Sequence, residues 1–320
     1  MLSRTDRRIE VTLSELLGFL KHAGYHFVTP TPATHHRVNL RIENKLARSL
    51  TDVFGWNRSF GKQLLPEMVF GVLAESEVIT ETSNGWKSVV RASTVGTEIF
   101  LHSSFPTVAA DAVFFGPDTY RFVKAIRSHM AANPLGVGRV LDIGCGSGAA
   151  GIVIAKKCST CEVLMTDVNE AALQMSRINS NFAGTNNCLS IDSDLFERVD
   201  GKFDLIVSNP PYLNDPLERK YRHGGGILGS ELSKKIVETS LSRLAPLGTL
   251  LLYTGSPIID GVDAFYGAVK KLLSQKSFGW SYEEIDPDVF GEELDTSTYR
   301  SADRIAVVVL TVKNRESERC

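Results

Sequence analysis

The stretch Val140-Leu-Asp-Ile-Gly-Cys-Gly-Ser-Gly148 decides the fold of the larger part of the chain. Its apolar residues predict a short buried strand, and three alternating glycines, Gly144, Gly146 and Gly148, then open a helix. Glycine permits a tight turn and lets a ligand approach the backbone closely. The stretch therefore predicts a strand, a turn and a helix, with a ligand site at the turn. The simpler alternative is a turn that only joins the strand to the helix.

The same turn contains a match to the dinucleotide pattern G-x-G-x-x-G at Gly146, Gly148 and Gly151. Two features argue against a nicotinamide cofactor. The glycines start directly after the strand, earlier than that pattern requires, and Asp142 at the strand end would repel a pyrophosphate. An acid in this place suits a ligand with a cationic ammonium or sulfonium end.

From about residue 113 the chain alternates between strand and helix patterns, which is typical of a parallel sheet with helices on both faces. The helix after Asn169, for example, repeats apolar residues at helical spacing. We predict an α/β, doubly wound domain over residues 113–320. Its expected strands are 139–143, 162–166, 188–191, 203–207, 248–254, about 280–285, and 305–312.

Two acids follow the next strands. Asp167 closes the second strand, where a carboxylate can accept both hydroxyl groups of a ribose. The alternative is a helix cap, a role that Asn169 can fill instead. Asp194 follows the third strand and can accept from an adenine amino group, with Leu195 or Phe196 packed on the ring. The order of these acids predicts a nucleoside site.

The fourth strand ends in Asn209-Pro-Pro-Tyr212. Consecutive prolines fix the backbone and remove two N–H donors. The Asn209 side-chain oxygen and the Pro210 carbonyl can therefore accept both hydrogens of a planar –NH2 group, and Tyr212 offers a flat stacking face. This pattern indicates catalysis by positioning and electrostatic stabilisation, without a covalent nucleophile. A rigid turn is the alternative.

Together these motifs resemble those of class I S-adenosylmethionine-dependent methyltransferases, in the "methyltransferase small" group. This group includes HemK-type release-factor glutamine methyltransferases and ribosomal RNA guanine-N2 methyltransferases. The resemblance covers about residues 113–312 and implies a Rossmann-like seven-stranded sheet with the last strand antiparallel. It implies S-adenosyl-L-methionine as the cofactor, bound by Asp142, Gly144, Gly146, Gly148, Asp167, Asp194, Leu195 and Asn209, and an acceptor nitrogen held by Asn209, Pro210 and Tyr212.

We therefore expect an N-methyltransferase acting on a planar amide or amino nitrogen of a protein, a peptide or a small molecule. The first alternative is a ribosomal RNA or DNA base amino group, and the second is a non-catalytic partner protein that binds adenosylmethionine. Substrate contacts are expected from Phe115, Asp118 and Tyr120 before the first helix, and from Arg222 and His223 after the fourth strand. Each of these segments has an alternative role, as a helix-start turn and as a solvated loop.

Residues 1–112 are expected to form a smaller α+β module for substrate recognition or packing. Its predicted helices are 12–24, opened by a capping box at Thr12 and Glu15, 39–54 and 66–73. Its predicted strands are 77–82, 86–91 and 97–102, which favours a winged-helix-like hairpin. This departs from the helical bundle of HemK-type proteins and from the duplicated domain of many guanine methyltransferases. The acceptor is therefore not inherited from either group.

Composition excludes several classes of protein. Of 320 residues 43% are hydrophobic and 22% charged, which excludes a wholly disordered chain. The net charge of −2 gives no global attraction to nucleic acid or an anionic membrane, although a local patch would suffice for nucleic acid. We expect a cytoplasmic protein without targeting signal, membrane span or metal, whose Cys158 and Cys161 are ordinary thiols. The oligomeric state stays open.

Overall fold

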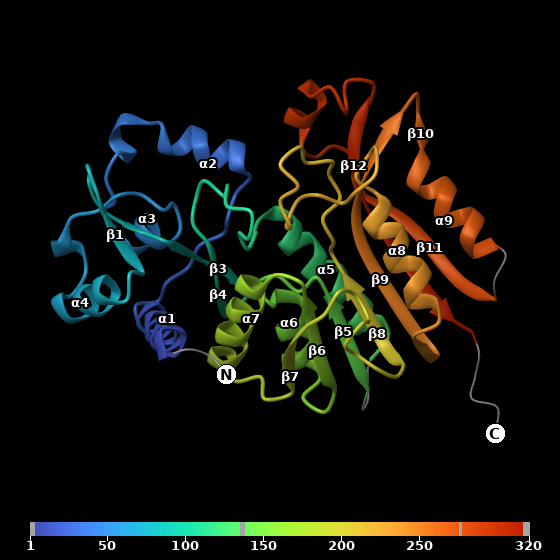
Figure 1. The fold of residues 1–320 in the computed structure, drawn as a ribbon, viewed down its shortest axis with the longest axis horizontal. Helices are drawn as coiled ribbons and strands as arrows, with labels where there is room; N and C mark the ends of the chain where they lie inside the picture. The colour runs from blue at the N-terminus through green and yellow to red at the C-terminus, as the bar shows by residue number, and fades with distance from the viewer. Residues whose placement is uncertain (1–3, 135–137, 275–276, 316–320) are drawn as a thin grey trace.

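The computed structural model describes residues 4–134, 138–274 and 277–315. The chain forms an N-terminal α+β part and a larger α/β part that contains the central sheet (Figure 1). The outer ends of the two predicted domains, residues 1–3 and 316–320, lie outside the described residues. In the part of the chain that is described, no helix has both the length and the apolar character needed to cross a membrane.

Seven strands run through the central sheet in the order β11-β12-β9-β8-β5-β6-β7, and β10 (Val262–Asp263) pairs with β9 at its end. Neighbours are parallel from β9 to β7, whereas β12 is antiparallel to both β9 and β11. The expected α/β fold with an antiparallel last strand is confirmed. The bounds are β5 Arg139–Ile143, β6 Glu162–Asp167, β7 Cys188–Asp192, β8 Phe203–Ser208, β9 Leu244–Ile259, β11 Phe278–Asp286 and β12 Arg304–Asn314.

Helices cover both faces of this sheet because adjacent strand residues point to opposite sides. Val140 packs in one core with α5 and α6, and Leu141 packs in a second core with α8 and α9. The chain changes direction across the sheet at β5, which lies between β6 and β8. In parallel sheets, ligands bind at such a switch point, beyond the carboxyl ends of the strands. The helices are α5 Pro117–Ala132, α6 Ala149–Lys157, α7 Glu170–Ala183, α8 Glu231–Leu241 and α9 Ala264–Ser274.

The N-terminal part contains four helices and two separate hairpins among its described residues. The hairpin predicted between 77–82 and 86–91 forms as β1 and β2, although the strand predicted over 86–91 is divided between β2 and β3. The elements are α1 Arg4–His22, α2 Pro32–Asn39, α3 Leu50–Phe54, α4 Glu67–Glu75, β1 Ile79–Thr82, β2 Gly85–Ser88, β3 Val90–Val95 and β4 Glu98–Ser103, with 3-10 turns at Ile42–Asn44 and Lys62–Leu64.

Two helix predictions in this part are wrong. The first helix starts before Thr12, whose buried hydroxyl pairs with Ser76 Oγ at 2.9 Å instead of capping a helix end. The helix predicted over 39–54 is interrupted, because Asn44 donates its side-chain amide to the Val38 carbonyl and Ser49 caps a new helix, α3. Short polar side chains of this kind compete with helical backbone bonds.

Helix α7 joins the two parts of the chain. Ile178, one of its predicted apolar positions, is buried in the N-terminal core beside Met175 and Phe182. The buried Asn179 side chain exchanges two hydrogen bonds with the backbone of Leu101 in β4, at 2.9 and 3.0 Å. It also donates to the Ser147 carbonyl in the glycine turn at 2.9 Å. The N-terminal part is therefore coupled to the turn at the ligand site.

Cys158 and Cys161 form a disulfide with their Cα atoms 5.5 Å apart, so the expectation of two ordinary thiols is wrong. The bond closes the short loop between α6 and β6, where the backbone amide of Cys161 also donates to the Cys158 carbonyl.

Candidate active site

A cleft of about 230 Å³ opens at the carboxyl ends of β5, β6 and β8, at the switch point of the sheet. Most of the residues predicted from the motifs meet there, although they come from separate loops. The predicted residues that line it are Asp118, Asp142, Gly144, Gly146, Asp167, Asp194, Leu195, Asn209, Pro210, Tyr212 and Arg222. Their assigned roles in binding and catalysis stay predictions.

The three predicted glycines have different surroundings. Gly144 and Gly146 line the cleft with left-handed backbone angles, φ of 69° and 53°, and a side chain at either would point into open space. Gly148 is also left-handed, but it caps α6 and does not line the cleft. A side chain there would press on Ser176 and Met165 in the interior. Gly148 therefore permits close packing between helix and sheet.

Asp142 lies at the end of β5 and is only 1% exposed. Its Oδ2 accepts from the backbone amide of Gly151 in α6 at 2.9 Å. Burial raises the pKa of Asp142 to about 7, since the charged form loses its hydration, and the negative charge of Asp167 acts in the same direction. The cleft thus contains a carboxyl group that changes its charge near neutral pH.

Asp167 closes β6 and faces the glycine turn. Its Oδ2 accepts from the Gly146 amide at 3.0 Å, and its Oδ1 accepts from the Asn169 amide at 2.9 Å. Burial raises the pKa of Asp167 above its usual value, while these amide donors oppose the shift. Asn169 caps α7 by accepting from Ala171. The carboxylate of Asp167 is therefore left to face the cleft.

After β7, Asp194 and Leu195 line the cleft, but Phe196 does not. Phe196 packs near Phe203 under the second face of the sheet, with the Arg243 guanidinium 5.0 Å from its ring centre. Of the two side chains expected to pack on an adenine ring, only Leu195 is in place. The Asp194 carboxylate lies 3.8 Å from Lys235 Nζ, and both side chains are about half exposed.

The Asn209–Tyr212 turn extends from β8 along the wall of the cleft. Within the described part of the chain, neither the Asn209 carboxamide nor the Pro210 carbonyl has a hydrogen-bond partner. Both acceptors predicted for an –NH2 group are therefore uncommitted. The Tyr212 ring is mostly buried, and its hydroxyl donates to Asp118 Oδ2 at 2.7 Å.

Phe115 and Tyr120, both predicted to contact the substrate, lie away from the cleft. Phe115 is 1% exposed and stacks on His102 in the interior, with ring centres 4.9 Å apart. The Tyr120 hydroxyl accepts from the Thr29 amide at 3.0 Å. Phe114 lines the cleft instead and stacks on Tyr221 at 6.2 Å. The sequence could not distinguish the two adjacent phenylalanines, because this segment is not a regular strand.

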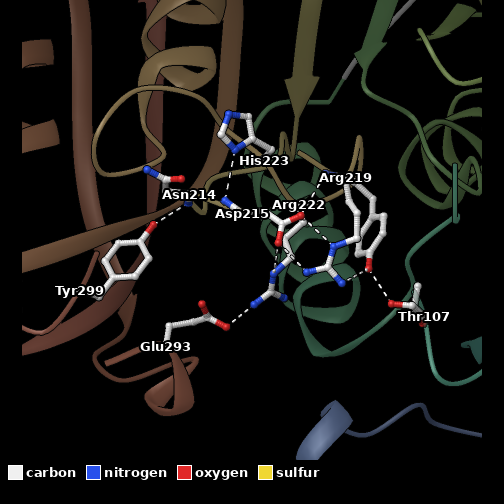
Figure 2. A network of polar contacts seen from close by, with 9 residues as sticks. Thr107, Asn214, Asp215, Arg219, Arg222, His223, Glu293 and Tyr299 are labelled. Carbon is white, nitrogen blue, oxygen red and sulfur yellow. Dashed lines mark hydrogen bonds and ion pairs between the residues drawn. The ribbon is translucent and has the colours of Figure 1, made fainter. Parts of the chain in front are cut away.

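Segment 213–229 follows the Asn209–Tyr212 turn and is held by a polar network (Figure 2). Asp215 accepts from Arg219 Nε at 2.7 Å and Nη2 at 2.5 Å. Arg222 lines the cleft and pairs with Glu293, which neutralises its charge. His223 does not line it, because its Nδ1 accepts from the Asp215 amide at 3.1 Å. The segment is thus held by specific contacts, although residues such as Leu217 and Ile227 are exposed, and the substrate roles of Arg222 and His223 stay predictions.

Among the lining residues that sequence reasoning missed are Pro32, Lys220 and Phe290. Lys220 is exposed and, within the described residues, forms no ion pair. Its backbone amide donates to Ala110, and the adjacent Tyr221 donates its hydroxyl to the Thr107 carbonyl, which places this segment beside the N-terminal part. Such contacts leave no periodic signal in the sequence.

The strand order and the cleft at its switch point are those of a Rossmann-like α/β domain. Residues 123–258 match the family model of the methyltransferase small domain.

Two curated relatives show the range of this likeness. The chain is 28% identical over 203 residues to ribosomal RNA small subunit methyltransferase C of Mannheimia succiniciproducens, covering 62% of this chain and 54% of the relative. It is 32% identical over 168 residues to the release factor glutamine methyltransferase of Rhodopirellula baltica, covering 48% and 54%. The chain thus spans about half the length of each relative.

Among solved structures, the T. thermophilus 16S rRNA N2 G1207 methyltransferase in complex with AdoMet and guanosine aligns with a TM-score of 0.47. The alignment covers 80% of this chain and 63% of that one, at 16% identity.

Proposed function

We propose that the protein is an S-adenosylmethionine-dependent N-methyltransferase that acts on a planar amide or amino nitrogen. The match of residues 123–258 to the methyltransferase small domain supports the reaction class. The uncommitted Asn209 carboxamide and Pro210 carbonyl in the cleft carry the assignment of a nitrogen acceptor.

The residues of the cleft fit this cofactor. Gly144 and Gly146 present backbone without side chains toward open space, which lets a ligand lie against the turn. Asp167 would accept from the ribose hydroxyl groups, and Asp194 from the adenine amino group beside Leu195. The buried Asp142 would face the cationic end. When bound, the cofactor supplies an electrophilic methyl group on a sulfonium.

The chain itself would position the acceptor nitrogen. The Asn209 oxygen and the Pro210 carbonyl would accept its two hydrogens, which keeps the nitrogen lone pair directed at the methyl group. Because the two prolines restrict the turn, these acceptors need little reorganisation during the reaction. Tyr212 would bound the acceptor on its ring side.

For the acceptor we propose a protein, a peptide or a small molecule, in keeping with the net charge of −2. A nucleic-acid base is the second candidate, and one observation favours it. The exposed Arg37, Arg41 and Lys45 on and after α2 have no carboxylate partner among the described residues. The same helix begins at Pro32, which lines the cleft.

Labelled transfer tests both points. The enzyme is incubated with methyl-tritiated S-adenosylmethionine and the protein, RNA and small-molecule fractions of a cell extract. Label in the RNA fraction, lost steeply as salt rises, would identify the second candidate, since phosphate contacts are salt-dependent. Calorimetric binding of the cofactor without label in any fraction would instead indicate a non-catalytic partner protein.

Asn209→Ala tests the nitrogen mechanism. We expect the cofactor affinity to stay within about threefold and kcat to fall by on the order of 10²-fold, the usual scale for a positioned polar group. Asn209→Asp keeps an oxygen acceptor but adds negative charge, so partial activity would favour an amine-like acceptor. Unchanged turnover in Asn209→Ala would refute a nitrogen acceptor held by this side chain.

A further inference from the structure

One buried carboxylate, that of Asp118, joins three elements beside the cleft. Asp118 lies in the first turn of α5 and is 5% exposed. Its Oδ2 accepts from the Tyr212 hydroxyl and its Oδ1 accepts from the Tyr253 hydroxyl, each at 2.7 Å. Tyr253 belongs to β9 and does not line the cleft. The first turn of α5 is thus connected to both the Asn209–Tyr212 turn and the sheet.

The two carboxylate oxygens differ in their remaining partners. Arg121 Nη1 also donates to Oδ1, at 3.3 Å, and Arg121 Nη2 pairs with Asp286 at 2.7 Å. Tyr212 is the one donor to Oδ2 among the described residues. Loss of the Tyr253 hydroxyl therefore leaves Oδ1 a donor, whereas loss of the Tyr212 hydroxyl leaves Oδ2 without one.

The ring of Tyr212 is confined on its other sides. It lies directly against Gly255, where an added side chain would overlap the ring, and Phe290 meets it edge-on with ring centres 5.9 Å apart. Only Pro210 and Pro211 separate Tyr212 from Asn209, and their φ angles are restricted by their rings. A displacement of Tyr212 is therefore transmitted to Asn209 with little loss.

We propose that Asp118 is a positioning residue for methyl transfer, which acts by holding Tyr212 and, through the two prolines, the Asn209 carboxamide. This inference rests on the proposed function of the cleft. It assigns the bond to Tyr212 a role in catalysis and the bond to Tyr253 a role in stability alone.

The paired tyrosines provide a matched control. Both are buried, and both donate at the same distance to the same carboxylate. If Asp118 served only to satisfy buried hydroxyl groups, Tyr212→Phe and Tyr253→Phe would affect stability alone, and neither would change the Asn209 carboxamide. A positioning role makes them differ, because only Tyr212 continues into the turn that lines the cleft.

The test compares these two variants in three measurements that do not need the acceptor. They are the melting temperature, the calorimetric affinity for S-adenosylhomocysteine, and the ¹⁵N-resolved side-chain amide signal of Asn209, assigned by its absence in Asn209→Ala. We expect affinities within about threefold of the wild type for both variants. The melting temperature should fall more in Tyr212→Phe than in Tyr253→Phe, because only the former leaves a carboxylate oxygen of Asp118 without a donor. The Asn209 signal should shift or broaden in Tyr212→Phe and stay unchanged in Tyr253→Phe.

Methyl transfer gives the fourth measurement, with whichever extract fraction the wild type labels. In Tyr212→Phe the single-turnover rate should fall by about tenfold or more, and in Tyr253→Phe it should stay within about twofold. Asp118→Asn keeps one acceptor oxygen and should retain more activity than Asp118→Ala. An Asn209 signal that is unchanged in Tyr212→Phe, or changed equally in both tyrosine variants, would overturn the proposal.

The two hypotheses fail in different ways. Absence of label with the wild-type enzyme in every fraction would refute the proposed function, while the amide spectra would still decide whether Asp118 holds the turn. Label that is transferred equally well by wild type and Tyr212→Phe would refute the positioning role and leave the proposed function intact.

Discussion

Asp167 and Gly146 are joined by a hydrogen bond of 3.0 Å from the backbone amide of the glycine to the carboxylate at the end of the next strand. The second oxygen of the same carboxylate holds Asn169, which begins α7. One side chain therefore fixes the glycine turn relative to the following helix while it faces the cleft. If Asp167 binds the cofactor as proposed, this geometry would link cofactor binding to the conformation of the turn.

Asp167→Ala should weaken cofactor binding at least about tenfold, a loss of about 1.4 kcal/mol, because both the expected ribose contact and the support of the turn disappear. Asp167→Asn keeps one acceptor oxygen, so its cofactor affinity should lie between that of Asp167→Ala and that of the wild type. Calorimetry with S-adenosylmethionine measures this. Asp192→Asn is the control. Asp192 stands opposite Asp167 on the neighbouring strand, but its carboxylate forms an ion pair with Arg198 and does not line the cleft. Unchanged affinity in Asp167→Ala would refute the assigned cofactor site.

The buried carboxyl group of Asp142 is expected to make both the stability of the protein and its affinity for the cofactor depend on pH. Its pKa rises from 3.8 to about 7 on folding, so the folded protein holds this proton more tightly than the unfolded chain does. Its contribution to stability is therefore present below pH 3.8 and is lost as the pH rises to about 7. Cofactor affinity should change in the opposite direction, because the ionised carboxylate attracts the cationic end of the ligand.

Asp142→Asn should remove both trends while keeping an oxygen for the Gly151 amide. Denaturant unfolding and calorimetry between about pH 5 and 8 would measure them, since the raised pKa lies within this range. If the wild type and Asp142→Asn had parallel pH profiles, another group would be responsible for the titration.

The ion pair between Asp215 and Arg219 is expected to hold segment 213–229 in its observed conformation. Bidentate hydrogen bonds from Arg219 lower the pKa of Asp215 to about 2, so the stabilisation is present above pH 3.8 and is lost as the pH falls through about 2. Asp215→Ala leaves two arginines without this carboxylate and should loosen the segment. Hydrogen exchange of the Leu213 and Gly224 amides, which bond within it, should accelerate at least about tenfold.

The control for this prediction is Glu284→Ala, which breaks another two-fold contact to an arginine, Arg304, at the surface. That side chain is about one-third exposed, so its loss should cost less than about 1 kcal/mol. Equal exchange rates in Asp215→Ala and the wild type would show that the segment is held by its other contacts.

Gly255→Ala should displace Tyr212, since the added methyl group would overlap its ring. Overpacking of this kind costs about 1–3 kcal/mol, and the displaced turn should lower methyl transfer about tenfold or more. Gly267→Ala is the control, because it lies on the exposed surface of α9 with no atom near the new methyl group. It should raise stability by about 0.5–1 kcal/mol. Chemical denaturation and the transfer assay measure both, and full activity in Gly255→Ala would contradict this account.

The sequence predicts an element correctly where its local pattern of apolar residues matches the burial of that element in the folded structure. The strand at 139–143 was predicted with its observed bounds, and the strand at 203–207 is one residue longer in the structure. Both are short, mostly apolar stretches that end in turn-forming residues, because a parallel strand is buried on both faces. In the N-terminal part the helix predicted over 39–54 failed, since asparagine and serine side chains bond to the backbone and stop the helix there.

The same difference between what a local pattern predicts and what it misses applies to the candidate site. Motif order placed Gly144, Gly146, Asp167, Asp194 and Asn209 at the ends of successive strands, and the ends of parallel strands meet at one edge of the sheet. Phe115 and Gly148 were assigned to the same site but face the interior. Adjacent residues in an irregular segment differ in direction, and no periodicity reveals which of them faces the ligand.

By itself, the sequence determined the α/β domain, the order of its strands along the chain and the motifs at their ends, because these depend on hydrophobic period and on the local chemistry of glycine and proline. Tertiary structure alone decided which distant groups share a contact. Asp118 meets Tyr212 and Tyr253, and Lys220 reaches the cleft beside the N-terminal part, since packing brings together segments that are far apart in the chain. Such pairings arise from the free energy of the whole core, which a pattern within a single segment does not contain.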